Sequence, residues 1–128
     1  MAKNIGYLLV SLMVLLQGFY GVFAYLDPVS FANVRGTALV ANGDIDWVQI
    51  YASRTVFISL IIGTLLYFRE SKVLMWAALL GTVMPLSDGY LAYQAEAPLS
   101  VIAKHIATIV YLIITSLVLF KVVASEKA

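Results

Sequence analysis

Four long apolar segments constrain this chain more than any other feature of its sequence. They cover residues 5–26, 47–68, 73–93 and 99–120, and each matches the roughly 20 residues that a helix needs to cross a bilayer. Hydrophobic residues make up 62% of the 128-residue chain, whereas soluble domains are about 45–50% apolar. A soluble domain of this size could not bury so much apolar surface. We therefore predict an all-α polytopic membrane protein, a single domain folded as an antiparallel bundle of four transmembrane helices.

The rest of the composition excludes several classes of function. The chain has no cysteine, so it has no disulfide framework and no thiolate metal site. Its formal net charge of +1 is too weak for the basic footprint of a nucleic-acid-binding protein. No glycine-rich phosphate loop, serine elbow or HExxH motif is present. We therefore expect no nucleic-acid partner, no metal and no cofactor.

The positions of lysine and arginine predict the orientation of the bundle. They gather at the amino end, in the second connection and in the tail: Lys3, Arg69, Lys72, Lys121 and Lys127. Because cytoplasmic loops carry the excess of basic residues, we expect a multi-pass protein of the cytoplasmic membrane with both termini in the cytoplasm. The first segment also has features of a cleaved signal peptide, but its apolar run exceeds the usual length of such a peptide.

The long first connection has structural signals of its own. Asp27 followed by Pro28 is typical of a helix N-cap and first turn, and apolar residues then repeat at helical spacing. We predict a short interfacial helix over residues 28–41 that covers the outer mouth of the bundle; an irregular loop is the alternative. Asp44 and Asp46 could form a metal-binding pair, but capping of the following helix by one of them is the favoured interpretation.

Polar side chains interrupt the apolar segments at one common depth. Arg54, Asp88 and His105 each lie about 8–10 Å below the outer end of their helix, and Gln17 and Tyr20 reach the same level from the first segment. A charged residue inside a membrane span costs several kcal/mol, so it usually faces the bundle interior. We predict a polar site in the outer-leaflet half of the bundle.

Helical spacing adds further side chains to this layer. Tyr51 precedes Arg54 by one turn, and Thr108 and Tyr111 follow His105 along the last segment. The predicted ligand-binding residues are therefore Arg54, Tyr51, Tyr20, Gln17, Tyr111 and Thr108.

The charged members of the layer allow structural and functional interpretations. Pro85 predicts a kink that turns Asp88 into the bundle, where it could form a structural ion pair with Arg54 or bind a ligand. His105 is either a proton-transfer group or a histidine hydrogen-bonded to a neighbouring helix. Lys104 is expected to extend outward to the membrane surface.

Three functional hypotheses follow. In the first, the site binds a small lipophilic molecule, such as an isoprenoid or quinone, or acts on it by acid/base chemistry with Asp88 and His105 as catalytic residues. In the second, the polar layer is structural and the chain is a non-catalytic accessory subunit of a membrane complex. In the third, the chain is a small transporter or channel subunit. The expected partners are the lipid bilayer, a lipophilic small molecule, and further copies of the chain or other membrane subunits.

Several short motifs also resemble a known family. They are Asp27-Pro28, Phe31-Ala32, Gly36, Tyr51-x-x-Arg54, Pro85-Leu86-x-Asp88 and His105. Together they resemble the domain-of-unknown-function family DUF4267, which is similar to the broader DoxX-like membrane proteins. The resemblance implies a four-helix membrane fold, and the family has no settled activity to transfer. Asn33 departs from the family pattern, which leads us to expect a basic residue there.

Overall fold

The computed structural model describes residues 1–36 and 44–127, and the regular structure in both stretches is helical. In chain order the helices are α1 (Ala2–Leu26), α2 (Pro28–Arg35), α3 (Asp44–Tyr67), α4 (Ser71–Leu80), α5 (Val83–Gln94) and α6 (Leu99–Lys127). Three of them, α1, α3 and α6, are long and apolar enough to cross a membrane. The all-α prediction is confirmed, and three of the four predicted spans correspond to single long helices.

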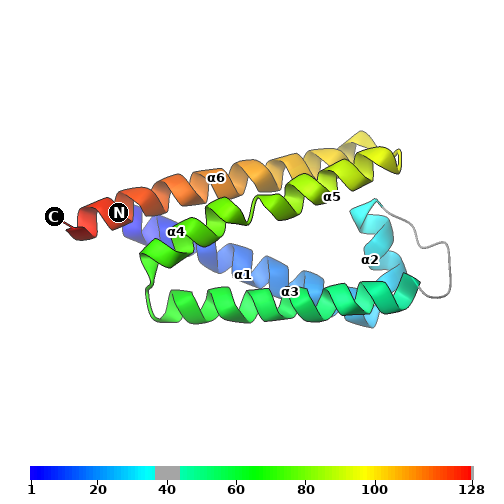
Figure 1. Ribbon diagram of the computed structural model, residues 1–128, viewed down its shortest axis with the longest axis horizontal. Helices are drawn as coiled ribbons and strands as arrows, with labels where there is room; N and C mark the ends of the chain where they lie inside the picture. The colour runs from blue at the N-terminus through cyan, green and yellow to red at the C-terminus, as the bar shows by residue number, and fades with distance from the viewer. Residues whose placement is uncertain (37–43, 128) are drawn as a thin grey trace.

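The helices form two layers that meet at one end (Figure 1). α1 packs along α3, while α4 and α5 follow one another along α6. α1 also contacts α6, and α3 contacts α4, toward the end where both chain termini lie. At the opposite end α5 packs mainly on α6, and the short α2 contacts α1 and α3. The layers are therefore joined directly at the terminal end.

A glycine explains the close packing of α1 against α3. Gly21 is buried, and a Cβ atom there would lie 2.6 Å from Val56 Cγ2 and 3.3 Å from the carbonyl oxygen of Ala52. Small residues let helix backbones approach closely in a membrane, where apolar side chains gain nothing by leaving lipid. Farther along the same contact, the Ser59 hydroxyl donates a hydrogen bond to the Val14 carbonyl at 2.9 Å. These contacts hold α1 and α3 together.

The third apolar segment is interrupted, although the sequence predicts one kinked span over residues 73–93. α4 and α5 are separated at Gly81 and Thr82. Pro85 has no backbone N–H to donate to the Gly81 carbonyl, which accepts instead from the Met84 N–H at 3.1 Å. The two helices have 10 and 12 residues, and neither alone reaches the roughly 20 residues of a membrane span. The predicted kink is thus an interruption of the regular helix at two residues, one turn before the proline.

α2 begins where the sequence predicts but ends earlier. The Asp27 side chain accepts a hydrogen bond from the backbone N–H three residues on, at 3.3 Å, and so caps the helix. The predicted helix covers residues 28–41, whereas the observed one ends at Arg35. Gly36 follows with φ of 84°, a left-handed conformation that favours glycine and ends helices. Residues 37–41 of the predicted helix lie outside the described residues.

α2 contacts both layers. Phe31 is 4% exposed and packs in a buried cluster with Ala24 of α1 and Ala52 of α3. At the other end of α2, a Cβ atom on Gly36 would lie 2.8 Å from Val101 Cγ1 of α6. The short helix therefore bridges the layers at the end away from the termini. Its expected position at the membrane interface stays a prediction.

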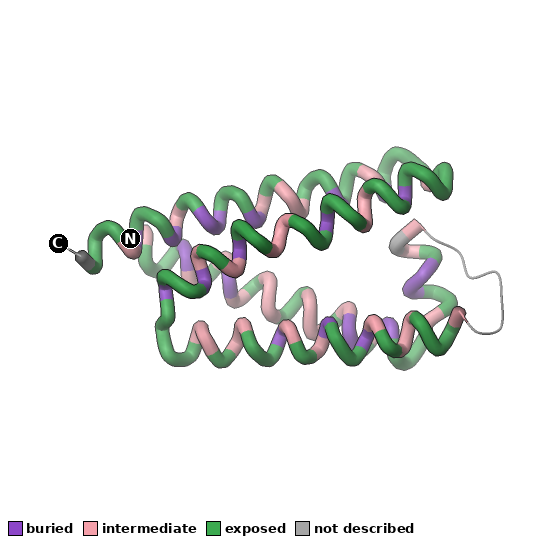
Figure 2. Tube along the Cα trace, in the orientation of Figure 1, coloured by how far each residue is buried: buried purple, intermediate pink, exposed green. Residues whose placement is uncertain are grey.

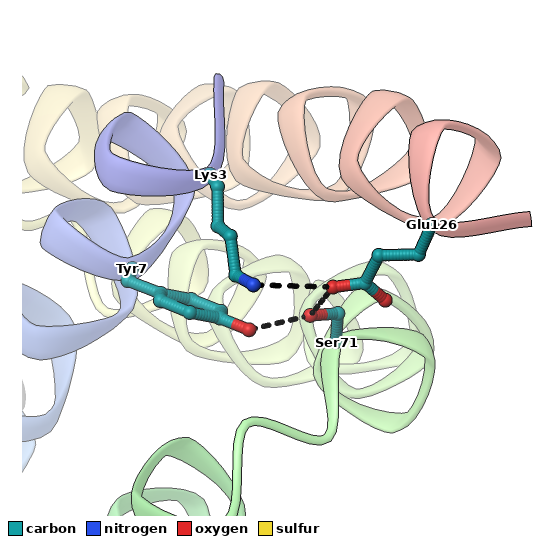
Figure 3. Close-up of polar contacts among 4 residues, drawn as sticks. All are labelled: Lys3, Tyr7, Ser71 and Glu126. Carbon is teal, nitrogen blue, oxygen red and sulfur yellow. Dashed lines mark hydrogen bonds and ion pairs between the residues drawn. The ribbon is translucent and has the colours of Figure 1, made fainter. Parts of the chain in front are cut away.

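A polar network links the layers at the terminal end (Figure 3). The hydroxyls of Tyr7 and Ser71 lie 2.7 Å apart, and the Ser71 hydroxyl donates to a Glu126 carboxylate oxygen at 3.3 Å. Lys3 Nζ lies 3.9 Å from the same oxygen. The network joins the start of α1, the first residue of α4 and the last turns of α6.

Apolar side chains cover the outer faces of the long helices. Buried residues lie mainly between the helices, and exposed residues cover the outside (Figure 2). The exposed set includes Leu15 of α1, Phe57 of α3 and Leu117 of α6. Soluble monomers rarely expose contiguous apolar surface on this scale, so this surface fits a protein surrounded by lipid.

The Gly21 contact predicts a specific loss of stability. Gly21→Ala should lower the free energy of unfolding by about 1–3 kcal/mol, because the added methyl group overpacks the α1–α3 contact. In Gly63→Ala the new Cβ atom meets Val14 Cγ1 at 3.6 Å, an ordinary contact, and alanine is the better helix former by roughly 1 kcal/mol. Thermal unfolding in detergent measures the stability of both variants against that of the wild type. Equal destabilisation by the two substitutions would contradict the close crossing at Gly21.

Candidate functional site

A cavity of about 410 Å³ lies between the two layers. α1, α3, α4, α5 and α6 all contribute to its wall, and Val34 of α2 lies at one end. This volume falls within the range of roughly 300–1,000 Å³ that is typical of small-molecule sites. The cavity is therefore the candidate functional site.

Seven of the eight predicted site residues line this one cavity. They come from four helices and are Gln17, Tyr20, Tyr51, Asp88, His105, Thr108 and Tyr111. Helices from both layers thus bring together side chains that lie far apart in the sequence. Their roles as catalytic or ligand-binding residues stay predictions.

Arg54 is the exception, and its expected ion pair with Asp88 is wrong. The Arg54 side chain is exposed, does not line the cavity, and donates a hydrogen bond to the Ile50 carbonyl at 3.3 Å. Among the described residues, an ion pair forms elsewhere, between Lys3 and Glu126. Helix geometry explains the error. Arg54 comes three residues after Tyr51 and lies about 60° from it around the helix axis, on the opposite side from Thr55, which comes four residues after Tyr51.

The cavity face of α3 instead follows the four-residue spacing from Tyr51. Thr55 and Ser59 come one and two turns later, are buried, and line the cavity. Neither residue was predicted to belong to the site, although hydroxyl side chains spaced four residues apart in an apolar segment could have indicated them. Lys104 also lines the cavity, but the residue is exposed, which is consistent with the expected outward extension; its reach to the membrane surface stays a prediction. Lys104 belongs to the same α6 face as Thr108, one turn away.

His105 carries the most unusual polar atom in the cavity wall. The residue is 8% exposed, and its Nε2 atom is buried with no hydrogen-bond partner among the described residues. Gly89 of α5 faces it, and a Cβ atom there would lie 3.2 Å from His105 Cβ. Since nearly all buried polar groups are paired, and an unsatisfied one costs about 1–3 kcal/mol, this nitrogen indicates a position where a bound molecule would form a hydrogen bond.

Most hydroxyls of α6 already donate to backbone carbonyls. The Tyr111 hydroxyl donates to Leu9 of α1 at 2.5 Å, and Thr108 donates to Lys104 at 2.9 Å. Their oxygens can still accept a hydrogen bond. Tyr111 therefore ties α6 to α1 as well as lining the cavity. The Gln17 amide donates to the Met13 sulfur at 3.7 Å.

Aromatic rings cover the end of the cavity beneath α2. The Phe31 ring lies 6.0 Å from that of Tyr20 and 5.6 Å from that of Tyr51. Both tyrosines line the cavity. Because Phe31 is the buried anchor of α2, the position of this helix and the positions of the two tyrosines depend on each other.

The residues do not assemble a metal site in the part of the chain that the structure describes. There, no group of three or more histidine, aspartate and glutamate side chains comes together. α3 begins at Asp44, so Asp44 and Asp46 lie in its first turn. Carboxylates at this position stabilise the positive end of a helix dipole.

Comparisons with known proteins give one match. A family model described as a domain of unknown function, DUF4267, matches residues 14–119. No curated protein and no solved structure matches the chain, so the expected similarity to DoxX-like proteins stays a prediction. The matched range contains His105, Asp88 and most of the cavity wall. Because the match covers more than half of its length, the chain belongs to the DUF4267 family of domains of unknown function.

Proposed function

We propose that this protein is an integral membrane protein that binds a small lipophilic molecule with an uncharged, hydrogen-bonding head group. The observation that carries the proposal is the buried, unpartnered Nε2 atom of His105 on the wall of the cavity. An imidazole nitrogen in this setting gains a full hydrogen bond when a hydroxyl or carbonyl group reaches it.

The two ends of the cavity differ in polarity, which supports an amphiphilic ligand. The end beneath α2 has Tyr20, Tyr51, Asp88, Lys104 and His105. The end toward the chain termini is lined largely by aliphatic side chains, which include Val10, Val14, Ile62, Leu74 and Leu112. A head group at the first end and a hydrocarbon tail at the second would match both surfaces.

The charges around the head-group position favour an uncharged ligand. Asp88 and Lys104 are the charged residues of the described cavity wall, and their charges are opposite. A ligand with a full charge would add an uncompensated charge to a site of low polarity, which is costly. A hydroxyl or carbonyl head group avoids this cost and still satisfies His105.

We also propose that the site acts on its ligand by acid/base chemistry. Asp88 and His105 lie on the neighbouring helices α5 and α6 and line one cavity. A carboxylate can accept a proton, and an imidazole can accept or donate one. We assign them this role toward a bound hydroxyl or carbonyl group.

Two other hypotheses are less well supported. A purely structural polar layer, as expected for an accessory subunit, would pair each buried polar atom, and His105 Nε2 is not paired within the described residues. A channel would need an opening at the terminal end. There the buried cluster of Val10, Leu74 and Leu119 and the network around Ser71 occupy the interior.

We further propose that the chain crosses the membrane four times with both termini in the cytoplasm. Together α4 and α5 extend over residues 71–94, about the length of α3. Both termini lie at the same end of the helices (Figure 1), which fits an even number of crossings. The basic residues at this end favour the cytoplasmic side.

Single cysteines test this topology, because the chain has none of its own. Ala95→Cys, in the α5–α6 turn, should react with a membrane-impermeant thiol reagent on intact cells. Glu70→Cys, in the α3–α4 turn, should react only after the cells are opened. Both positions are exposed in the structure. The reverse labelling pattern would contradict the orientation, and labelling of both in intact cells would contradict the even number of crossings.

Mass spectrometry of organic extracts tests the binding proposal. The wild-type protein and Arg54→Gln, which changes a residue outside the cavity, should retain the same neutral lipophilic molecule during purification. The amount of this molecule that copurifies with His105→Leu should be lower by about tenfold, since a lost hydrogen bond of about 1.5 kcal/mol reduces the binding affinity by that factor. His105→Gln, which keeps a polar amide, should retain part of it. Equal retention by His105→Leu, or an extract of the wild type without such a molecule, would contradict the proposal.

The stability of ligand-free protein separates binding from a structural role. After delipidation, His105→Leu should unfold at the same or a higher temperature than the wild type, because it removes an unsatisfied buried nitrogen that costs about 1–3 kcal/mol. A structural histidine would give the opposite result. A marked fall in the unfolding temperature of His105→Leu would therefore favour the accessory-subunit hypothesis.

A further inference from the structure

We propose that the cavity measures the length of its ligand's hydrocarbon tail, and that Leu74 is the residue that sets this length. This inference rests on the proposed function, since it requires the head group to be held at the His105 end. The ligand class is then a single-chain amphiphile with a neutral head group.

The cavity is long in the direction of the helices. On α3 its wall extends from Tyr51 to Ile62, and on α6 from Lys104 to Thr115. Each interval corresponds to about 16 Å of helix. The agreement between the two helices indicates an elongated space, which suits one extended chain lying parallel to them.

The aliphatic end of this space is firmly closed. Val10 of α1 and Leu74 of α4 line the cavity and also belong to the buried cluster that contains Leu119. One turn farther toward the termini, the hydroxyls of Tyr7 and Ser71 lie 2.7 Å apart. This contact holds α1 and α4 together directly behind the two cavity-lining side chains, so a longer tail cannot push them apart without breaking it.

Leu74 is the side chain whose size matters most at this end. It is 2% exposed and lines the cavity, whereas Leu119 is fully buried in the same cluster but does not line the cavity. Replacing a buried leucine by alanine leaves space that the surroundings fill only partly. Leu74→Ala therefore lengthens the cavity, and Leu119→Ala is a control with similar loss of packing. Ala78 lies one turn nearer the head group on the same wall, so Ala78→Val should shorten the cavity.

A series of primary alcohols from octanol to octadecanol tests the inference. The thermal stabilisation of the full chain in lipid nanodiscs is measured with each alcohol for the wild type and the variants. For the wild type it should rise with chain length to a maximum and then fall. Leu74→Ala should move the maximum to longer alcohols by about two methylene groups, and Ala78→Val should move it to shorter ones. Leu119→Ala should lower stability but leave the maximum unchanged.

The outcomes distinguish failure of the inference from failure of the proposed function. If His105→Leu reduces the stabilisation by every alcohol, but Leu74→Ala and Ala78→Val leave the maximum in place, the cavity binds the amphiphile and does not measure its tail. If Leu119→Ala moves the maximum as far as Leu74→Ala, general loosening explains the shift and the role of Leu74 is wrong. If no alcohol stabilises the wild type, the proposed function itself fails.

Discussion

The cavity depends on the interruption in the third apolar segment. α4 packs on both α3 and α6, whereas α5 packs mainly on α6, so this segment stays along α6 but moves away from α3 beyond the point where its helix breaks. Pro85 causes the break, because it cannot supply the N–H that a continuous helix needs there. An unsatisfied carbonyl in lipid costs several kcal/mol, and the Met84 N–H satisfies that of Gly81 at 3.1 Å. The backbone thus stays hydrogen-bonded while the two layers separate.

The ends of the cavity are closed by different kinds of interaction. At the terminal end, Val10, Leu74 and Leu119 form an apolar cluster backed by the hydrogen bond between Tyr7 and Ser71. At the other end α2 is anchored mainly by aromatic and small apolar contacts. A cross-helix hydrogen bond is present there as well, from the Gln49 amide of α3 to the Tyr25 carbonyl of α1 at 3.4 Å, but it is exposed. Polar and titratable groups gather at the second, which is where a ligand's head group would meet them.

Much of the fold and of the site follows from local sequence signals. The length of the apolar runs identifies α1, α3 and α6, and Asp27 identifies the start of α2. Polar residues inside an apolar span face the interior, which is why Asp88 and His105 were found. The same expectation was wrong for Arg54, because the row of α3 that faces the cavity runs from Tyr51 to Thr55, and Arg54 lies beside this row. It also missed Thr55 and Ser59, whose hydroxyl groups are too weakly polar to stand out within an apolar run.

The sequence by itself determined the membrane-like class and most of the helical segments. These properties depend on chain length, hydropathy and capping, which act within one segment. Only the tertiary structure decided which helix faces converge, that Lys104 lines the cavity and Arg54 does not, and that His105 Nε2 is buried without a partner. The reason is physical. In water an apolar stripe marks the buried face of a helix, but in lipid both faces are apolar, and small residues such as Gly21 select the contacts instead.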